Sequence, residues 1–292
     1  MKSSYLEIIT GVQHDLLTVA NQEGLTSAIT DASSSLLVII DAQNDFIPGG
    51  SLAVPGADQD MDRLSKWIYD NMSKLTRTAL SLDTHIPFQI FHPCWWIDKN
   101  GKNPSPFTAI TLADLDNGKW APVLKPKESR EYVQGLEKTG KKVLVVWPFH
   151  CLQGTNGAAL SSKISNMIYY HCVARNTVPY RLVKGNDPLT EMYGIIKAEF
   201  DPKNFINLPF VSMLEKYDKV IIAGEAKSHC VLESIAQILD FYKNRPEVTK
   251  KIYILDDCMS SIPGCEDATE KAFDGFKKNF QINIVKSTEY AL

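Results

Sequence analysis

Four short apolar runs without polar interruption most restrict how this chain can fold. They cover residues 36–40 (LLVII), 143–146 (VLVV), 220–223 (VIIA) and 252–255 (IYIL). A run that does not alternate with polar residues is typical of a strand buried on both faces. Weaker strand candidates lie at residues 78–82 and 180–183. Helical periodicity separates the runs, at residues 61–75, 130–138, 157–170, 230–242 and 266–279.

Strands that alternate with helices predict right-handed crossovers and a mainly parallel sheet. We therefore expect an α/β fold of three layers, with helices on both faces of the sheet and a Rossmann-like topology. The 292 residues are enough for one large domain with extensions. Residues 1–33 are predicted to be an N-terminal extension that packs on the core or caps a partner, and residues 34–292 to be a single domain.

Residues 93–127 are predicted to be a long ordered insertion in this domain. The segment is rich in Pro, Asn, Gly and Lys and carries Trp95, Trp96 and Trp120. A long loop in a compact domain is usually functional or interfacial. The tryptophans could anchor a contact between subunits or line a pocket.

Charge and cysteine content exclude several classes of protein. A net charge of −3 gives no basic surface for phosphates, so we expect no nucleic-acid partner. No apolar run is long enough to span a bilayer, and the N-terminal residues do not resemble a signal peptide, so we expect a cytoplasmic protein with no membrane partner. The six cysteines contain no CxxC pair and are expected to be reduced thiols.

Reactive side chains follow five of the expected strands. They are Asp41, Asp83 with His85, His150, Lys184 and Cys230. In an open parallel sheet, ligands bind beyond the carboxyl ends of the strands. The sequence therefore predicts that these groups from separate segments lie at one edge of the sheet.

Cys230 is the candidate nucleophile. It is expected to open the helix at residues 230–242, where the helix dipole would lower the pKa of a thiol. The alternative is a buried structural cysteine. Taken alone, Asp41 would be an aspartate in a turn at a strand end and Lys184 a surface lysine. Beside a cysteine, the carboxylate can accept the thiol proton and the ammonium can stabilise the thiolate.

Asp83 and His85 are candidate metal ligands. Their spacing places both side chains on the same face of an extended segment. His92 and His150 could complete a site of one carboxylate and three imidazoles, which suits Zn²⁺, Fe²⁺ or Mn²⁺. A single histidine of this set would more often be a hydrogen-bonded core residue. His229, beside the candidate nucleophile, could be either.

Four segments resemble motifs of the isochorismatase-like cysteine hydrolase superfamily, and within it the nicotinamidases. They are DAQNDF (41–46) with IPGGSLAVPGA, DTH (83–85), WPFHC (147–151) with GTNG, and VKG (183–185) with GEAKSHCV (224–231). The similarity keeps the order of the motifs from about residue 36 to residue 285. The sequence departs from the family pattern at Lys227 and Ser228, where Thr and Asp are usual.

This resemblance implies a role for each matching position. Cys230, Asp41 and Lys184 would form the catalytic triad, and the backbone N–H groups of Ala226 and Cys230 the oxyanion hole, with a cis peptide before Ala226. The other implied roles are one divalent metal ion held by Asp83, His85, His150 and His92, and substrate binding by Phe46, Trp147 and Gln43. A homo-oligomer is also implied.

The implied activity is hydrolysis of nicotinamide, or of a similar small carboxamide, to acid and ammonia through a thioester. One alternative is a related hydrolase that acts on another amide or carbamoyl group. Isochorismatase activity fits less well, because it needs no metal and would leave Asp83, His85 and His150 without a purpose. A catalytically silent binding or scaffold protein is a more remote alternative.

Overall fold

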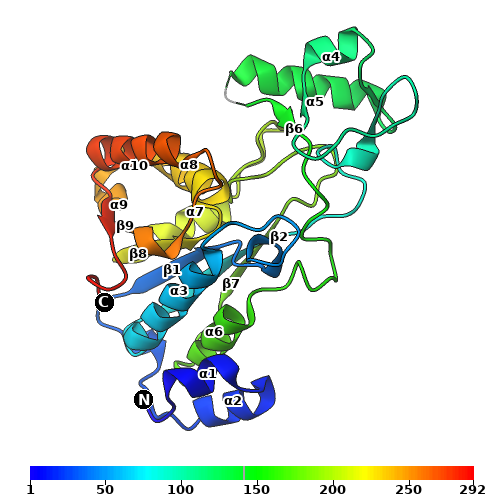
Figure 1. The fold of residues 1–292 in the computed structure, drawn as a ribbon. Coiled ribbons are helices and arrows are strands. Elements are labelled where there is room, and N and C mark those ends of the chain that lie inside the picture. Colours follow the sequence, from blue (N-terminus) through cyan, green and yellow to red (C-terminus); the bar gives the residue numbers. More distant parts are fainter. Residues whose placement is uncertain (141) are drawn as a thin grey trace.

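A six-stranded sheet forms the centre of the computed structural model, which describes residues 1–140 and 142–292 (Figure 1). The strand order is β10-β9-β8-β1-β2-β7, and every pairing in this sheet is parallel. The strands are β1 (Ser35–Ile40), β2 (Arg77–Asp83), β7 (Tyr180–Lys184), β8 (Lys219–Gly224), β9 (Ile252–Leu255) and β10 (Asn283–Val285). The predicted α/β class is therefore confirmed.

Helices cover both faces of this sheet because its central strands are apolar on both sides. In β1, Leu36 and Val38 contribute to the core on one face, and Leu37 and Ile39 to the core on the other. The first face packs against α7 (Leu208–Leu214), α8 (Leu232–Phe241), α9 (Pro246–Thr249) and α10 (Glu266–Phe280). The second face packs against α3 (Ala57–Asn71) and α6 (Ser162–Ala174). The result is the expected three-layer arrangement.

The N-terminal residues form two short helices, α1 (Tyr5–Thr10) and α2 (Gln13–Ala20), next to α6 (Figure 1). Ile8 and Leu16 are buried in the core that α3 and α6 share with the sheet. The Asn166 side chain on α6 donates hydrogen bonds to backbone carbonyls of this segment, including that of Gly11. These contacts attach the first residues firmly to the domain.

A small unit with its own apolar core lies apart from the sheet (Figure 1). It contains β3 (Trp96–Ile97), β4 (Ala109–Ile110), α4 (Leu112–Asp116), β5 (Ala121–Pro122), α5 (Pro126–Thr139) and β6 (Leu144–Val145). Trp95 and Trp96 are almost fully buried in this core, and their ring N–H groups donate to Ser129 Oγ and Ile90 O. Trp95 and Trp96 therefore stabilise the unit from within, whereas Trp120 is only partly buried against the same core and stays a candidate for a contact with another subunit.

The predicted strand at residues 143–146 is the main error at the level of the fold. Only Leu144 and Val145 form a strand, which pairs antiparallel with β4 and lies outside the central sheet. Its apolar residues are buried in the core of the small unit instead. An apolar run reveals burial, but it does not reveal which core receives it.

Two other expectations concern the whole chain. All six cysteines are free thiols, as predicted. In the described parts of the chain, no helix combines the length and apolar character needed to cross a membrane.

Candidate active site

The candidate catalytic residues lie at the carboxyl ends of four neighbouring strands, β8, β1, β2 and β7. Asp41 directly follows β1, and Asp83 and Lys184 are the last residues of β2 and β7. Asp83 and Lys184 are also register partners in the sheet. Cys230 follows β8 after a short loop. The topology thus brings together residues that are far apart in the sequence.

Lys184 contacts both Cys230 and Asp41, and all three side chains are buried. The Lys184 ammonium lies 2.9 Å from Asp41 Oδ2 and 3.6 Å from the Cys230 sulfur. Lys184 thus links the Cys230 sulfur to the Asp41 carboxylate. Ser81 holds the carboxylate in place, since its hydroxyl donates to Asp41 Oδ1 at 2.6 Å. A base, a nucleophile and a cation therefore share one desolvated site.

Burial dominates the electrostatics of this group. It raises the pKa of the Cys230 thiol well above its usual value; Lys184 opposes the shift, and Asp41 and Asp83 add to it. Burial also raises the pKa of Asp41, against the effect of Lys184. For Lys184, burial acts to lower the pKa, but Asp41 and Asp83 outweigh it and hold the ammonium charged. The stable resting form therefore has a neutral thiol, a carboxylate and an ammonium.

This result corrects the predicted environment of Cys230. The residue lies in a π-helical segment, η4 (Lys227–Val231), and α8 begins only at Leu232. The expected lowering of the thiol pKa at a helix N-terminus is wrong, because burial and two carboxylates raise it. A neutral thiol needs a neighbouring base to become a nucleophile, and the Asp41 carboxylate is available for this.

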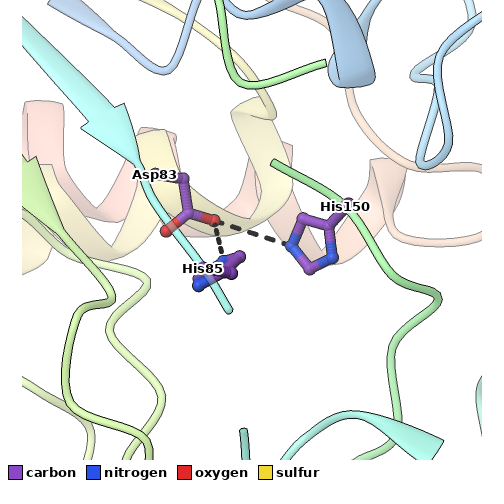
Figure 2. A group of neighbouring side chains, drawn as sticks. All are labelled: Asp83, His85 and His150. Atoms are coloured by element: carbon purple, nitrogen blue, oxygen red, sulfur yellow. Dashed lines mark hydrogen bonds and ion pairs between the residues drawn. The ribbon is translucent and has the colours of Figure 1, made fainter. Parts of the chain in front are cut away.

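Asp83, His85 and His150 form a compact cluster with the geometry of a metal site (Figure 2). One potential ligand atom from each lies within 4.8 Å of the others. Nε2 of His85 is 2.8 Å from Asp83 Oδ2, and Nε2 of His150 is 3.6 Å from the same oxygen. Burial alone would raise the pKa of Asp83, but His85 and Lys184 bring it well below its usual value.

The opposite ring nitrogens of the histidines support this interpretation. Nδ1 of His85 lies 3.3 Å from Gly185 O, and Nδ1 of His150 lies 2.7 Å from Pro148 O. Carbonyl acceptors at Nδ1 select the tautomer that leaves Nε2 free to bind a metal. A Cβ atom at residue 185 would lie 2.5 Å from the His85 ring, so glycine is required beside the cluster.

His92 lies near this cluster but is not one of its three members. Its ring centroid is 5.8 Å from those of His85 and His150. Its Nδ1 contacts Pro87 O at 3.0 Å, and its buried Nε2 has no hydrogen-bond partner in the described chain. Burial, together with His150 and His85, lowers the pKa of His92 to about 3. The neutral ring is therefore suited to ligate a metal after a small displacement.

A backbone donor is available beside the nucleophile. The Glu225–Ala226 peptide is cis, as the resemblance implied. Within residues 1–140 and 142–292, the Ala226 N–H donates to no protein acceptor. Ala226 and Cys230 both line the same pocket. A free N–H at this position can stabilise an oxyanion.

The pocket is a narrow slot with about 520 Å³ of space free of protein atoms, including its mouth. Cys230 and the three metal-type residues occupy part of its wall. Aromatic rings form much of the rest, contributed by Phe46, Phe91, Trp147 and Tyr193. His229 also lines it, and burial lowers the pKa of this histidine to about 4. The slot thus offers apolar walls and a few convergent polar groups, as small-molecule sites generally do.

Comparison with known proteins gives two curated relatives, both nicotinamidases. The nicotinamidase of Escherichia coli (strain K12) is 23% identical over 261 residues, which cover 88% of this chain and 94% of that protein. The nicotinamidase of Acinetobacter baylyi is 29% identical over 129 residues, and this match spans only 44% of either chain. No protein-family model matches the sequence.

Solved structures of nicotinamidases and pyrazinamidases have a similar fold. An Acinetobacter nicotinamidase/pyrazinamidase superposes with a TM-score of 0.59 at 21% identity, covering 88% of this chain and 98% of that one. The chain therefore shares the fold of this solved structure. A Pyrococcus horikoshii pyrazinamidase, crystallised in complex with zinc, superposes with a TM-score of 0.51 at 19% identity, covering 87% and 99%.

Gln43 does not line the slot. Its amide N–H₂ donates to Asp83 O at 2.7 Å and Ala158 O at 2.9 Å, and its carbonyl accepts from Asp83 N at 2.7 Å. The predicted contact with substrate is therefore not supported. Gln43 instead fixes the end of β2, where Asp83 emerges.

The sequence did not predict a role for Glu191 and Tyr193, which line the slot. They belong to the chain segment that connects β7 to α7. Glu191 Oε1 accepts hydrogen bonds from the Tyr193 hydroxyl at 2.8 Å and from Trp147 Nε1 at 3.2 Å. The Glu191 carboxyl thus holds two aromatic walls of the slot. The segment has neither strand nor helix periodicity, so no signal in the sequence marked it.

Proposed function

We propose that this protein is a metal-containing cysteine amidohydrolase that converts nicotinamide or a similar small carboxamide to the acid and ammonia. The observation that carries the proposal is the contact of Lys184 with both Cys230 and Asp41 beside a buried cluster of metal-type ligands. The naming of both curated relatives as nicotinamidases supports the choice of substrate class.

The aromatic lining of the slot favours a substrate with a flat ring. Phe46 and Trp147 lie on its wall, together with Phe91 and Tyr193. Aromatic side chains bind a planar heteroaromatic ring through offset or edge contacts and exclude water from it. The carboxamide would then lie next to Cys230 and Ala226.

The acylation half-reaction begins with proton transfer. Asp41 accepts the thiol proton of Cys230, and Lys184 stabilises the thiolate that forms. The sulfur attacks the carboxamide carbon, and the oxyanion accepts hydrogen bonds from the backbone N–H groups of Ala226 and Cys230. When the C–N bond breaks, Asp41 returns its proton to the leaving nitrogen. Ammonia departs, and a thioester remains on Cys230.

Hydrolysis of the thioester reverses these roles. Asp41 accepts a proton from water as the water oxygen attacks the thioester carbon, and the same N–H groups stabilise the second oxyanion. The C–S bond breaks, the sulfur regains its proton, and the carboxylic acid is released. One carboxyl group thus serves both half-reactions.

Asp83, His85 and His150 would hold one divalent ion, with His92 as a further ligand. The mixture of one carboxylate and imidazoles suits Zn²⁺, Fe²⁺ or Mn²⁺. Such an ion supplies a Lewis acid that can orient a heteroaromatic nitrogen in the slot. This chain's own contribution is to present the Nε2 atoms inward by fixing each Nδ1 on a backbone carbonyl.

The test is ammonia release from nicotinamide by the wild type and by Cys230→Ala. The variant should lose turnover by several orders of magnitude while it retains the metal, measured by elemental analysis, because Cys230 is not a ligand. Cys265→Ala, which removes a thiol at the start of α10, is the matched control and should be unaffected. Turnover by Cys230→Ala would contradict the mechanism. Turnover of other amides but not of nicotinamide would change the substrate.

A further inference from the structure

Two buried carboxyl groups face each other behind the segment that carries Ala226 and Cys230. Glu225 directly precedes Ala226, and Asp60 lies on α3; both are almost fully buried. Ser260 lies between them, because its N–H donates to Glu225 Oε2 and its hydroxyl donates to Asp60 Oδ2. Glu225 Oε1 has no conventional donor among the described residues. A buried carboxyl oxygen without a donor, next to a second buried carboxyl group, favours a proton on one of the two groups.

The surrounding donors identify Asp60 as the ionised partner. Its Oδ1 accepts from the Arg63 guanidinium, and its Oδ2 accepts from the Ser260 hydroxyl. Glu225 receives a single hydrogen bond, from the Ser260 N–H at 3.2 Å. Burial raises the pKa of Glu225 well above its usual value, and Asp60 raises it further against the weaker effect of Arg63.

The cationic side chains near Glu225 and Asp60 already have other partners. Lys227, two residues along the chain, forms ion pairs with Asp256 and Glu270. Arg63 also donates to the backbone carbonyl of Asp257. No second cation is therefore free, in the described structure around Glu225, to stabilise two adjacent carboxylates.

Residues after β9 hold the chain on both sides of Ala226. Ser260 O accepts the Lys227 N–H at 2.8 Å, and Ser228 Oγ accepts the Ile262 N–H at 3.0 Å. The Glu225 N–H donates to Ile40 O in β1 at 2.8 Å. The neighbours of Ala226 are thus fixed, while its own N–H is left available.

We propose that Glu225 is a positioning residue, which shares a proton with Asp60 and thereby fixes the Ala226 N–H where the oxyanion develops. The inference rests on the proposed function. Glu225 is bonded directly to the nitrogen of Ala226, so its anchoring to α3 and to Ser260 sets the direction of that N–H. Ser260 links the parts, because it contacts Asp60, Glu225 and Lys227.

Glu225→Gln and Glu225→Ala distinguish this role. In the glutamine variant, the side-chain N–H₂ can donate to Asp60 and the carbonyl can accept from Ser260, so kcat should stay within about threefold of the wild type. The alanine variant loses both contacts. Its kcat should fall by about 10-fold or more with little change in KM, since loss of an oxyanion donor costs ~10²–10³-fold in kcat. Glu225→Leu serves where the alanine variant does not fold.

Glu270→Ala is the matched control. It removes a carboxylate that supports the same segment through Lys227, and Lys227 keeps its ion pair with Asp256 at 2.8 Å. Its kcat should be unchanged. A full kcat in folded Glu225→Ala or Glu225→Leu would overturn the positioning role.

Infrared spectroscopy tests the shared proton independently of activity. At neutral pH the difference spectrum, wild type minus Glu225→Gln, should show the C=O stretching band of a protonated carboxyl group, because the band of Glu191, whose pKa is raised to about 7, is present in both proteins and cancels. Identical spectra would overturn the shared proton. If the wild type released ammonia from no carboxamide, the proposed function and the role of Ala226 would fail, while the band would still decide the state of the acid pair.

Discussion

Glu191 should make the stability of the protein depend on pH in a defined window. Its carboxyl is buried against Tyr193, Trp147 and Tyr132, which all donate hydrogen bonds to it. Burial, with a contribution from Glu199, raises the pKa of Glu191 from 4.5 to about 7. The folded protein therefore holds this proton at pH values where the unfolded chain has released it.

The sign and size of the effect follow from linkage. A carboxyl with a raised pKa in the folded state stabilises that state most below pH 4.5, the ordinary value, and the stabilisation is lost as the pH rises to about 7. At about 1.4 kcal/mol per pH unit, the free energy of unfolding should fall by about 3 kcal/mol across this window. Most of the change lies above pH 5.

Glu191→Gln removes the titrating group and keeps its size. Urea unfolding, followed by tryptophan fluorescence from about pH 5 to about pH 8, gives the free energy of unfolding for both proteins. The difference, wild type minus variant, should fall by about 2–3 kcal/mol with rising pH, whatever its absolute value. Glu128→Gln, at an exposed position in the first turn of α5, should give a flat difference. A flat or rising difference for Glu191→Gln would refute the reasoning.

Four further substitutions test other parts of the structure. Lys184→Met leaves Asp41 and Asp83 buried without their ammonium, so it should abolish turnover and lower the free energy of unfolding by about 3–5 kcal/mol in urea titrations. Asp83→Ala should abolish tight zinc binding in a chelator competition, whereas His92→Ala should weaken it by only ~10–100-fold; equal effects would place His92 among the principal ligands. Ile222→Ala, in the centre of β8, should cost about 2–5 kcal/mol of stability without altering the zinc affinity of the folded protein.

The strand ends were the most predictable part of this molecule. The runs at residues 36–40, 220–223 and 252–255 are all strands of the central sheet, because burial on both faces removes polar residues from them. Parallel strands place their carboxyl ends at one edge. The sequence therefore predicts that Asp41, Lys184 and Cys230 lie close together.

Other features depend on contacts that leave no local pattern. Residues 143–146 are as apolar as a central strand, but Leu144 and Val146 are buried in the core of the small unit that β3, β4 and α5 form. The pKa of Cys230 depends on burial and on two carboxylates from other strands, so its position before α8 gave the wrong direction. Glu191 lies in an irregular segment, and its role follows from three donors, one of them Tyr132 on α5.

The pairing of Asp83 with Lys184 across β2 and β7 has a consequence for how the protein acquires its activity. These residues are about a hundred positions apart in the chain, and β1 must also pair with β8 before the thiol reaches its base. Pairings of such high sequence separation form slowly. In a refolding experiment, helical circular dichroism should return first, and ammonia release should recover only when the last strands have docked, which makes catalysis a sensitive reporter of complete assembly of the sheet.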